Sequence, residues 1–162
     1  MRPIIIICLS SFWAVTTAQG SESKAQADIR AIETDVGSFY SSAATEQSHF
    51  PFSDMVSTKG HLIFLSGLVG TDANGELVSG GLAPETHAIF EQMQTYLAHL
   101  ALDLTDIVKC LVMIDDIGKW AEFNAIYTNY FTPPYPARSA MGADGLALGA
   151  ALELECIAVQ RR

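Results

Sequence analysis

Arg138 is the residue of this chain whose type and surroundings most clearly suggest chemistry. It is the only arginine between Arg30 and Arg161, and it stands in the segment 136–139, Pro-Ala-Arg-Ser, where the proline stiffens the backbone ahead of a strand. A guanidinium binds a planar carboxylate through two parallel hydrogen bonds, a geometry that lysine lacks. The pattern leaves two interpretations open: a fork that binds a carboxylate ligand, or an ordinary ion pair with a nearby acid.

Glu153 is the second candidate, within the Leu-Glu-Leu-Glu stretch of the last predicted strand. Side chains alternate along a strand, so Glu153 and Glu155 share one sheet face and the leucines share the other. A carboxylate so placed can orient or deprotonate a water molecule. The alternative is that both glutamates lie on a solvated outer face, which is the commoner situation.

Other catalytic devices are missing from the sequence. Ser66 has no glycine two residues before it, as a nucleophile elbow requires, and no CxxC, HExxH or phosphate-binding glycine loop occurs. The four histidines are scattered, and His87 and His99 lie twelve residues apart on one predicted helix, a spacing that does not suit a shared metal ion. We therefore expect no metal site.

The elements that position Arg138 and Glu153 follow from hydrophobic periodicity. Apolar residues recur at helical spacing after Pro84 and again after Gly118, whereas a β-branched run before Ile114 alternates as a strand does. The order hairpin, helix, strand, helix, two strands predicts an α+β architecture with two helices packed on one face of a sheet. The expected elements are strands at 54–58 and 61–66 around a turn at Lys59-Gly60, helices at 84–100 and 118–131, and strands at 106–114, 138–141 and 152–159.

Composition supports one compact domain and disfavours one class of partner. The chain has 162 residues, of which 49% are hydrophobic and 17% charged. Lys and Arg number 9 against 18 Asp and Glu, giving a net charge of −9. Nucleic-acid binding needs clustered cations that displace counterions from phosphates, so we expect no nucleic-acid partner.

The first residues have the pattern of a secretory signal peptide. Arg2 is followed by an apolar run at 3–15 with four consecutive isoleucines, and then by small residues at 16–18. We expect residues 1–19 to be removed on export, leaving a secreted or periplasmic protein without a membrane anchor. The alternatives are a buried core strand and a mis-assigned start. Residues 20–48 read as a partly helical N-terminal extension, with a helical stretch at 24–33, before a core domain at 49–162.

Cys110 and Cys156 both lie in apolar, strand-like stretches, whereas Cys8 lies in the signal segment. In an oxidising compartment the first two could pair, provided that their Cα atoms come within about 7 Å. We favour the simpler interpretation that they are two small buried hydrophobic residues.

The chain resembles the RidA (YjgF) family. The Pro-Ala-Arg-Ser segment, followed by the strand from Glu153 to Val159, is similar to the family's closing signature. The resemblance as a whole spans roughly residues 50 to 160. The further similar segments are 51–52 (Pro-Phe), 64–67 (Phe-Leu-Ser-Gly), 106–109 (Asp-Ile-Val-Lys), 123–127 (Phe-Asn-Ala-Ile-Tyr) and 130–131 (Tyr-Phe). None of these segments is specific to the family by itself.

The resemblance implies a chorismate-mutase-like fold, a homotrimer with clefts between subunits, and hydrolysis of 2-imino acids to 2-keto acids and ammonia without a cofactor. Arg138 would hold the substrate carboxylate and Glu153 would activate the attacking water. Gly67 and the backbone of Ala140 would cradle the ligand, with Ser66 at the cleft wall.

Three departures from the family pattern bear on the substrate. Phe52 replaces the usual cleft tyrosine, Ala140 replaces a frequent cysteine, and the glycine-rich loop 142–149 lacks the usual Leu-Pro. The leading hypothesis is a 2-imino acid deaminase. The alternative is a non-catalytic trimer that binds small carboxylates or acts as a holdase, and an endoribonuclease ranks third because of the acidic charge.

Overall fold

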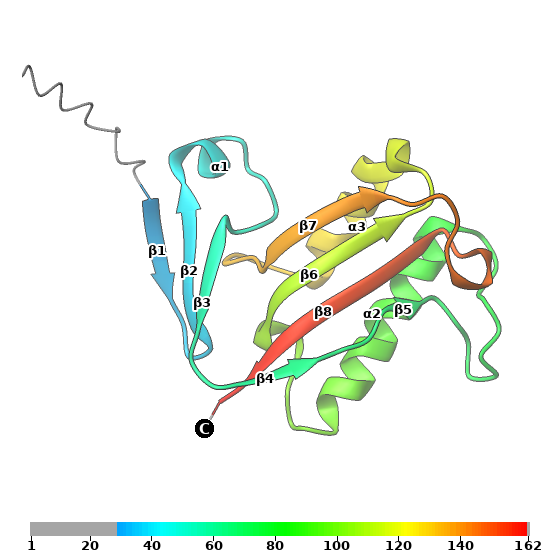
Figure 1. Cartoon of the computed structure of the whole chain (residues 1–162), viewed down its shortest axis with the longest axis horizontal. Helices are drawn as coiled ribbons and strands as arrows, with labels where there is room; N and C mark the ends of the chain where they lie inside the picture. The colour runs from blue at the N-terminus through cyan, green and yellow to red at the C-terminus, as the bar shows by residue number, and fades with distance from the viewer. Residues whose placement is uncertain (1–28, 162) are drawn as a thin grey trace, which may run out of the picture.

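The computed structural model describes residues 29–161, whose strands form two sheets (Figure 1). The smaller sheet has the order β1-β2-β3 and is antiparallel throughout. The larger sheet has the order β4-β8-β6-β7, with the short β5 also paired to β8. The strands are β1 (Ile29–Glu33), β2 (Gly37–Ser42), β3 (Met55–Thr58), β4 (His61–Phe64), β5 (Leu68–Val69), β6 (Ile107–Ile114), β7 (Ala137–Gly142) and β8 (Leu152–Gln160).

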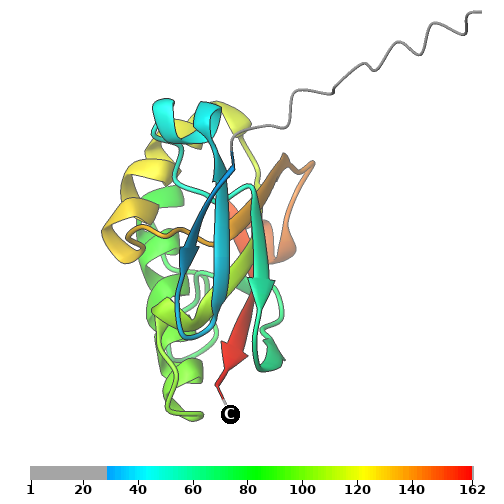
Figure 2. The same ribbon diagram turned by 90° about the vertical axis from the view of Figure 1, so that its left-hand side faces the viewer.

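Two long helices, α2 (Leu82–Ala98) and α3 (Trp120–Tyr130), lie together on one side of the larger sheet, which confirms the predicted α+β layers (Figure 2). Among residues 29–161, no helix has the length and apolar character needed to cross a membrane. The short helices are α1 (Ala43–Gln47), η1 (Leu104–Asp106), η2 (Ile117–Lys119) and η3 (Ala147–Gly149).

Strand β6 organises the larger sheet, because it pairs in parallel with β7 and antiparallel with β8. Its residues Cys110, Val112 and Ile114 are fully buried beneath the helices, and the intervening residues face the other way. The same alternation holds in β8, where Leu152 and Leu154 are buried in the core. The strand periodicity predicted from the sequence is therefore confirmed.

The predicted hairpin at residues 54–66 is only half right. Strands β3 and β4 both form, but β3 pairs with β2 and β4 pairs with β8, so they belong to different sheets. Gly60 between them has φ +143° and passes so close to the end of β8 that a Cβ would lie 2.5 Å from the Gln160 carbonyl oxygen. The chain thus crosses from one sheet to the other at the predicted turn.

The N-terminal extension is partly helical as predicted, but its helix is α1 (Ala43–Gln47) and not the stretch 24–33, and most of its described residues form β1 and β2. Within the stretch 24–33, residues 29–33 form β1, and the rest lies outside the described residues, as does the predicted signal peptide. Val36 and Phe39 pack against Val108 and Val159 of the larger sheet in a second small core. All five residues of β1 are exposed, whereas the first half of β2 is buried. The apolar contacts that hold the extension in place therefore come from β2 and not from β1.

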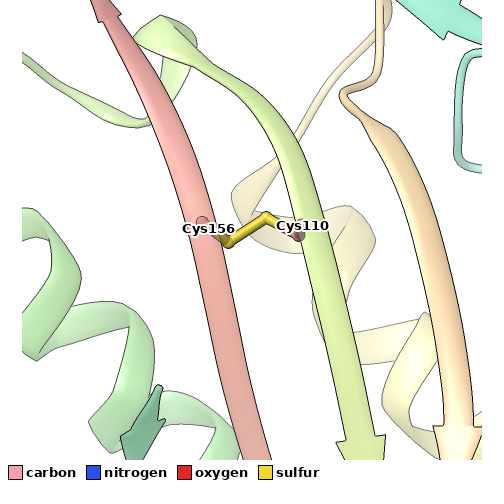
Figure 3. Close-up of a disulfide and its surroundings, with 2 residues drawn as sticks. All are labelled: Cys110 and Cys156. Carbon is pink, nitrogen blue, oxygen red and sulfur yellow. A yellow bond between two sulfur atoms is a disulfide. The ribbon is translucent and has the colours of Figure 1, made fainter. Parts of the chain in front are cut away.

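Cys110 and Cys156 form a disulfide between β6 and β8 (Figure 3). The expectation of two separate buried thiols is therefore wrong, although both residues are buried as predicted. The pairing depends on the antiparallel register that sets Cys110 directly opposite Cys156, with their Cα atoms 4.1 Å apart. Sequence alone gives no access to that register.

Candidate functional site

Strand β7 directs Arg138 towards the helices. In the parallel pairing of β6 with β7, Arg138 stands beside Cys110, whose side chain also points to the helix side of the sheet. The guanidinium carbon lies 4.5 Å from the ring centre of Tyr127 and 4.7 Å from that of Trp120, both on α3. Such stacking on aromatic faces stabilises a cation and fixes its orientation. Arg138 is thus a held, partly buried charge beneath α3.

No acid neutralises Arg138 within the described part of the chain. The four ion pairs found there involve Arg30, Lys59 and Arg161 only, and buried Nη1 of Arg138 has no hydrogen-bond partner. Burial lowers the pKa of Arg138, with the nearby Tyr127 opposing that shift, yet an arginine remains charged at physiological pH. The structural ion pair considered from the sequence is not formed among the described residues.

Two further polar atoms, both on α3, are buried without partners. They are the hydroxyl of Tyr127 and Oδ1 of Asn124, which lie three residues apart and so on one face of α3. Burial raises the pKa of Tyr127 well above its ordinary range, so the phenol stays protonated and can donate a hydrogen bond. Sequence analysis placed Tyr127 and Asn124 in a predicted helix and in the family resemblance without giving either a role at the site, because helical periodicity does not reveal unsatisfied polar groups.

Glu153 and Gly67 are in direct contact on the other side of the sheet. A Cβ built on Gly67 would lie 2.0 Å from Oε1 of Glu153, so only glycine fits at this position without moving the carboxylate. In the β6–β8 register Glu153 stands opposite Met113, which in turn stands beside Met141 of β7. Glu153 is half-buried, and Ser66 and Gly67 are exposed. The structure therefore brings together the predicted pair Glu153 and Gly67, with Ser66 adjacent in sequence.

Arg138 and Glu153 point to opposite faces of the sheet. Glu153 alternates with Leu152 and Leu154, which face the core under the helices, whereas Arg138 lies on that helix side itself. A single chain thus separates the two residues that the sequence suggested as one chemical centre. They can meet only if a second copy of the chain supplies one of them.

Ala140 lies near Arg138 on β7, whereas Phe52 lines a separate cleft whose lining does not include Arg138. Ser53, next to Phe52, forms a bridge to Ala137 in β7, and its hydroxyl donates a 2.6 Å hydrogen bond to the Tyr135 carbonyl. The ring of Phe52 stacks on Phe50 at 5.5 Å and lines a cleft of 380 Å³. Ala140 lies two residues beyond Arg138 on the same edge strand and is exposed.

Other titratable groups do not gather into a centre of their own. Within residues 29–161 no three His, Cys, Asp or Glu side chains lie close enough together to hold a metal ion. His87 Nδ1 lies 2.7 Å from the Tyr130 hydroxyl at the surface, and Lys109 Nζ donates a 2.7 Å bond to Ser139 Oγ on the open face of the sheet. Burial lowers the pKa of Lys109.

Comparison with known proteins identifies the family. Residues 43–160 match the family model described as Endoribonuclease L-PSP. The human 2-iminobutanoate/2-iminopropanoate deaminase is 37% identical over 99 residues, covering 60% of this chain and 72% of its own. Protein DfrA of Myxococcus xanthus is 33% identical over 111 residues, covering 67% of this chain and 85% of its own.

Solved structures agree with this assignment. RidA from an Antarctic Psychrobacter superimposes with a TM-score of 0.60 at 26% identity, covering 81% of this chain and 99% of its own. The YjgF gene product of E. coli superimposes with a TM-score of 0.58 at 29% identity, covering 68% and 89%. The chain therefore belongs to the RidA/YjgF family.

Proposed function

We propose that this protein hydrolyses 2-imino acids to 2-keto acids and ammonia. The observation that carries the proposal is the buried Nη1 of Arg138, a charged donor that no acid of the described chain satisfies. A cation without an acidic partner is costly when it is partly buried, and a ligand carboxylate that reached the guanidinium would supply the missing counter-charge. The names of the human and other relatives, which specify 2-iminobutanoate and 2-iminopropanoate, support the same substrate class.

In this mechanism Arg138 binds the substrate carboxylate while the adjacent imine carbon faces Glu153. The carboxylate of Glu153 takes a proton from a water molecule as the water oxygen bonds to the imine carbon, and it passes that proton to the imine nitrogen, which gives a carbinolamine. Glu153 then carries the hydroxyl proton of the carbinolamine to its nitrogen, the C–N bond breaks, and ammonia leaves the 2-keto acid. Each turnover consumes one water molecule, and no electrons are transferred.

The proposed site lies between two copies of the chain, one providing Arg138 and the other Glu153. Their placement on opposite faces of one sheet supports this arrangement. The position of Met141 supports it, because Met141 lies in register with Met113 and Glu153 and is 50% exposed. Exposed apolar side chains beside a site are typical of surfaces that another protein chain covers. We propose the homotrimer that the family resemblance implies, and light scattering would test it: a monomer would exclude the shared site.

A non-catalytic carboxylate-binding protein is the second candidate. One observation favours it: the arginine side, with Tyr127 and Asn124, is complete within a single chain, whereas the Glu153 side needs a partner. Such a protein would need Arg138 and be indifferent to Glu153. An endoribonuclease, the activity in the family model's description, fits less well with a net charge of −9.

Ammonia release from freshly generated 2-iminopropanoate and 2-iminobutanoate tests the proposal. We expect rates above buffer for the wild-type protein and near-complete loss for both Arg138→Ala and Glu153→Gln. Glu153→Gln keeps the size of the side chain and removes only its basicity, so it isolates the proposed proton transfer. Wild-type rates equal to buffer would contradict catalysis. An active Glu153→Gln protein would contradict the role of Glu153.

We also propose that the protein acts outside the cytoplasm. The signal-like segment at residues 1–19 motivates this proposal, and the Cys110–Cys156 disulfide supports it, since disulfides persist mainly in oxidising compartments. N-terminal sequencing of protein expressed in its host would test export. A mature chain that still begins at Met1 would contradict it.

A further inference from the structure

The disulfide and Arg138 lie in one row across three neighbouring strands. Cys156 of β8 stands opposite Cys110 of β6, and Cys110 stands beside Arg138 of β7. Figure 3 shows the sulfur bridge between the first two strands, with the third strand flanking β6 on its other side. All three side chains lie on the helix side of the sheet, so the disulfide lies in the layer from which Arg138 projects.

We propose that the Cys110–Cys156 disulfide is a positioning element for Arg138, holding its guanidinium at the place where it meets the ligand carboxylate. This proposal rests on the proposed function of Arg138 as a carboxylate anchor. It gives the disulfide a specific role in ligand affinity, in addition to the stability that any buried disulfide provides.

The position of Arg138 depends on β6 because β7 is an edge strand. In the described chain the other side of β7 meets only Ser53, in a single bridge to Ala137. The register of β7 is therefore set by its parallel pairing with β6. The disulfide in turn ties β6 to β8, with Cys110 and Cys156 at most 1% exposed. Interior side chains are closely packed, so a displacement of β6 is transmitted to its neighbours.

The disulfide is nearer to the arginine than to the glutamate. Arg138 is one strand spacing from Cys110, about 4.8 Å, whereas Glu153 is three residues along β8 from Cys156, about 10 Å. Glu153 also points to the opposite face, where its carboxylate lies against Gly67. Removal of the disulfide should therefore disturb carboxylate binding more than the proton transfer assigned to Glu153.

The test compares Cys110→Ala/Cys156→Ala with the control variant Ile107→Ala. Ile107 is buried on β6 but has no partner in β7, so its truncation weakens the core without touching the Arg138 row. We expect both variants to lower Tm by about 10 °C. Only the double cysteine variant should raise KM, by about tenfold, with kcat within twofold at a temperature where all three proteins are folded.

Binding of 2-ketobutanoate, a stable product of the proposed reaction, provides a readout that does not need turnover. Trp120, the only tryptophan in residues 29–161, stacks on Arg138, so its fluorescence should report the ligand. We expect Kd to rise about tenfold in the double cysteine variant and to stay within twofold in Ile107→Ala. Wild-type protein unfolded, reduced and refolded with a reductant should match the double variant, and it replaces that variant if the latter does not fold.

Equal Kd values for oxidised, reduced and Ile107→Ala proteins would overturn the positioning role, as would free thiols at Cys110 and Cys156 in protein prepared under oxidising conditions. A wild-type protein that binds 2-ketobutanoate in the expected pattern but releases no ammonia would contradict the proposed catalysis alone. A wild-type protein that does not bind 2-ketobutanoate would contradict both the anchor and its positioning.

Discussion

The Arg138 region and the Glu153 region lie on the same sheet but are built differently. Arg138 is enclosed by the aromatic side chains of α3 and by the disulfide row, and it retains unsatisfied polar atoms around it. Glu153 lies on an uncovered face beside Gly67, with exposed apolar residues nearby. The surroundings of Arg138 are thus formed within one chain. The Glu153 face is open in one chain and would be enclosed only by another molecule.

This difference separates affinity from chemistry. A preformed guanidinium fork binds a carboxylate equally in the ground state and the transition state. Its removal should therefore mainly raise KM. A carboxylate that takes a proton from water contributes only during the reaction, so its removal should mainly lower kcat. The following predictions test this division, in order of decreasing effect.

Arg138→Lys should lower kcat/KM for 2-iminobutanoate by about a thousandfold, chiefly through KM, although the charge is kept. The ammonium group can neither form two parallel bonds to a carboxylate nor stack flat between Trp120 and Tyr127. Steady-state ammonia release measures this. A lysine variant with wild-type KM would show that charge alone binds the substrate.

Gly67→Ala should lower kcat about a hundredfold with little change in KM, because the added Cβ would lie 2.0 Å from Oε1 of Glu153 and displace the carboxylate. Gly142→Ala is the matched control. Its Cβ would meet nothing closer than 3.5 Å, and the residue has no positive φ, so kcat should stay within twofold. Equal kcat values for the two variants would argue that Glu153 is not placed by Gly67.

Tyr127→Phe should raise the free energy of unfolding by about 1 kcal/mol and weaken 2-ketobutanoate binding. The substitution removes a buried hydroxyl that has no partner in the described chain and whose ring lies against the Arg138 guanidinium. Urea denaturation and a fluorescence titration measure the two effects. A destabilised variant would mean that the hydroxyl has a partner in the folded chain.

Stability at alkaline pH should depend on the same tyrosine. Burial raises the pKa of Tyr127 in the folded chain, so titration of this phenol costs no stability below about pH 10, and stability is lost as pH rises above that unfolded-state value. Between pH 9 and pH 11 we expect the wild-type protein to lose about 1 kcal/mol more unfolding free energy than Tyr127→Phe. Parallel losses in both proteins would contradict this burial.

Much of the fold could be predicted from local pattern, because helical and strand periodicity directly record which side of an element faces the core. This is why α2, α3 and the alternation around Glu153 were predicted correctly. The separate pairing of β3 and β4, the strands at residues 29–42 and the disulfide depend on contacts between distant segments. Single-residue patterns carry no information about such registers.

The same limit applies to the site. The residue types of Arg138 and Glu153 drew attention to them, yet their placement on opposite faces follows only from the pairing of three strands. Asn124 and Tyr127 were missed as site residues because their signal is an unsatisfied polar atom in the packed structure.

Mixing two inactive proteins tests the central claim most directly. If Arg138 of one protomer and Glu153 of another form each site, then assemblies made by refolding Arg138→Ala and Glu153→Gln together will contain some sites with both native residues. Equal mixing in a closed cyclic oligomer predicts that about one quarter of the wild-type ammonia release returns. If assemblies shown to contain both variants remain as inactive as either variant alone, the shared site is contradicted.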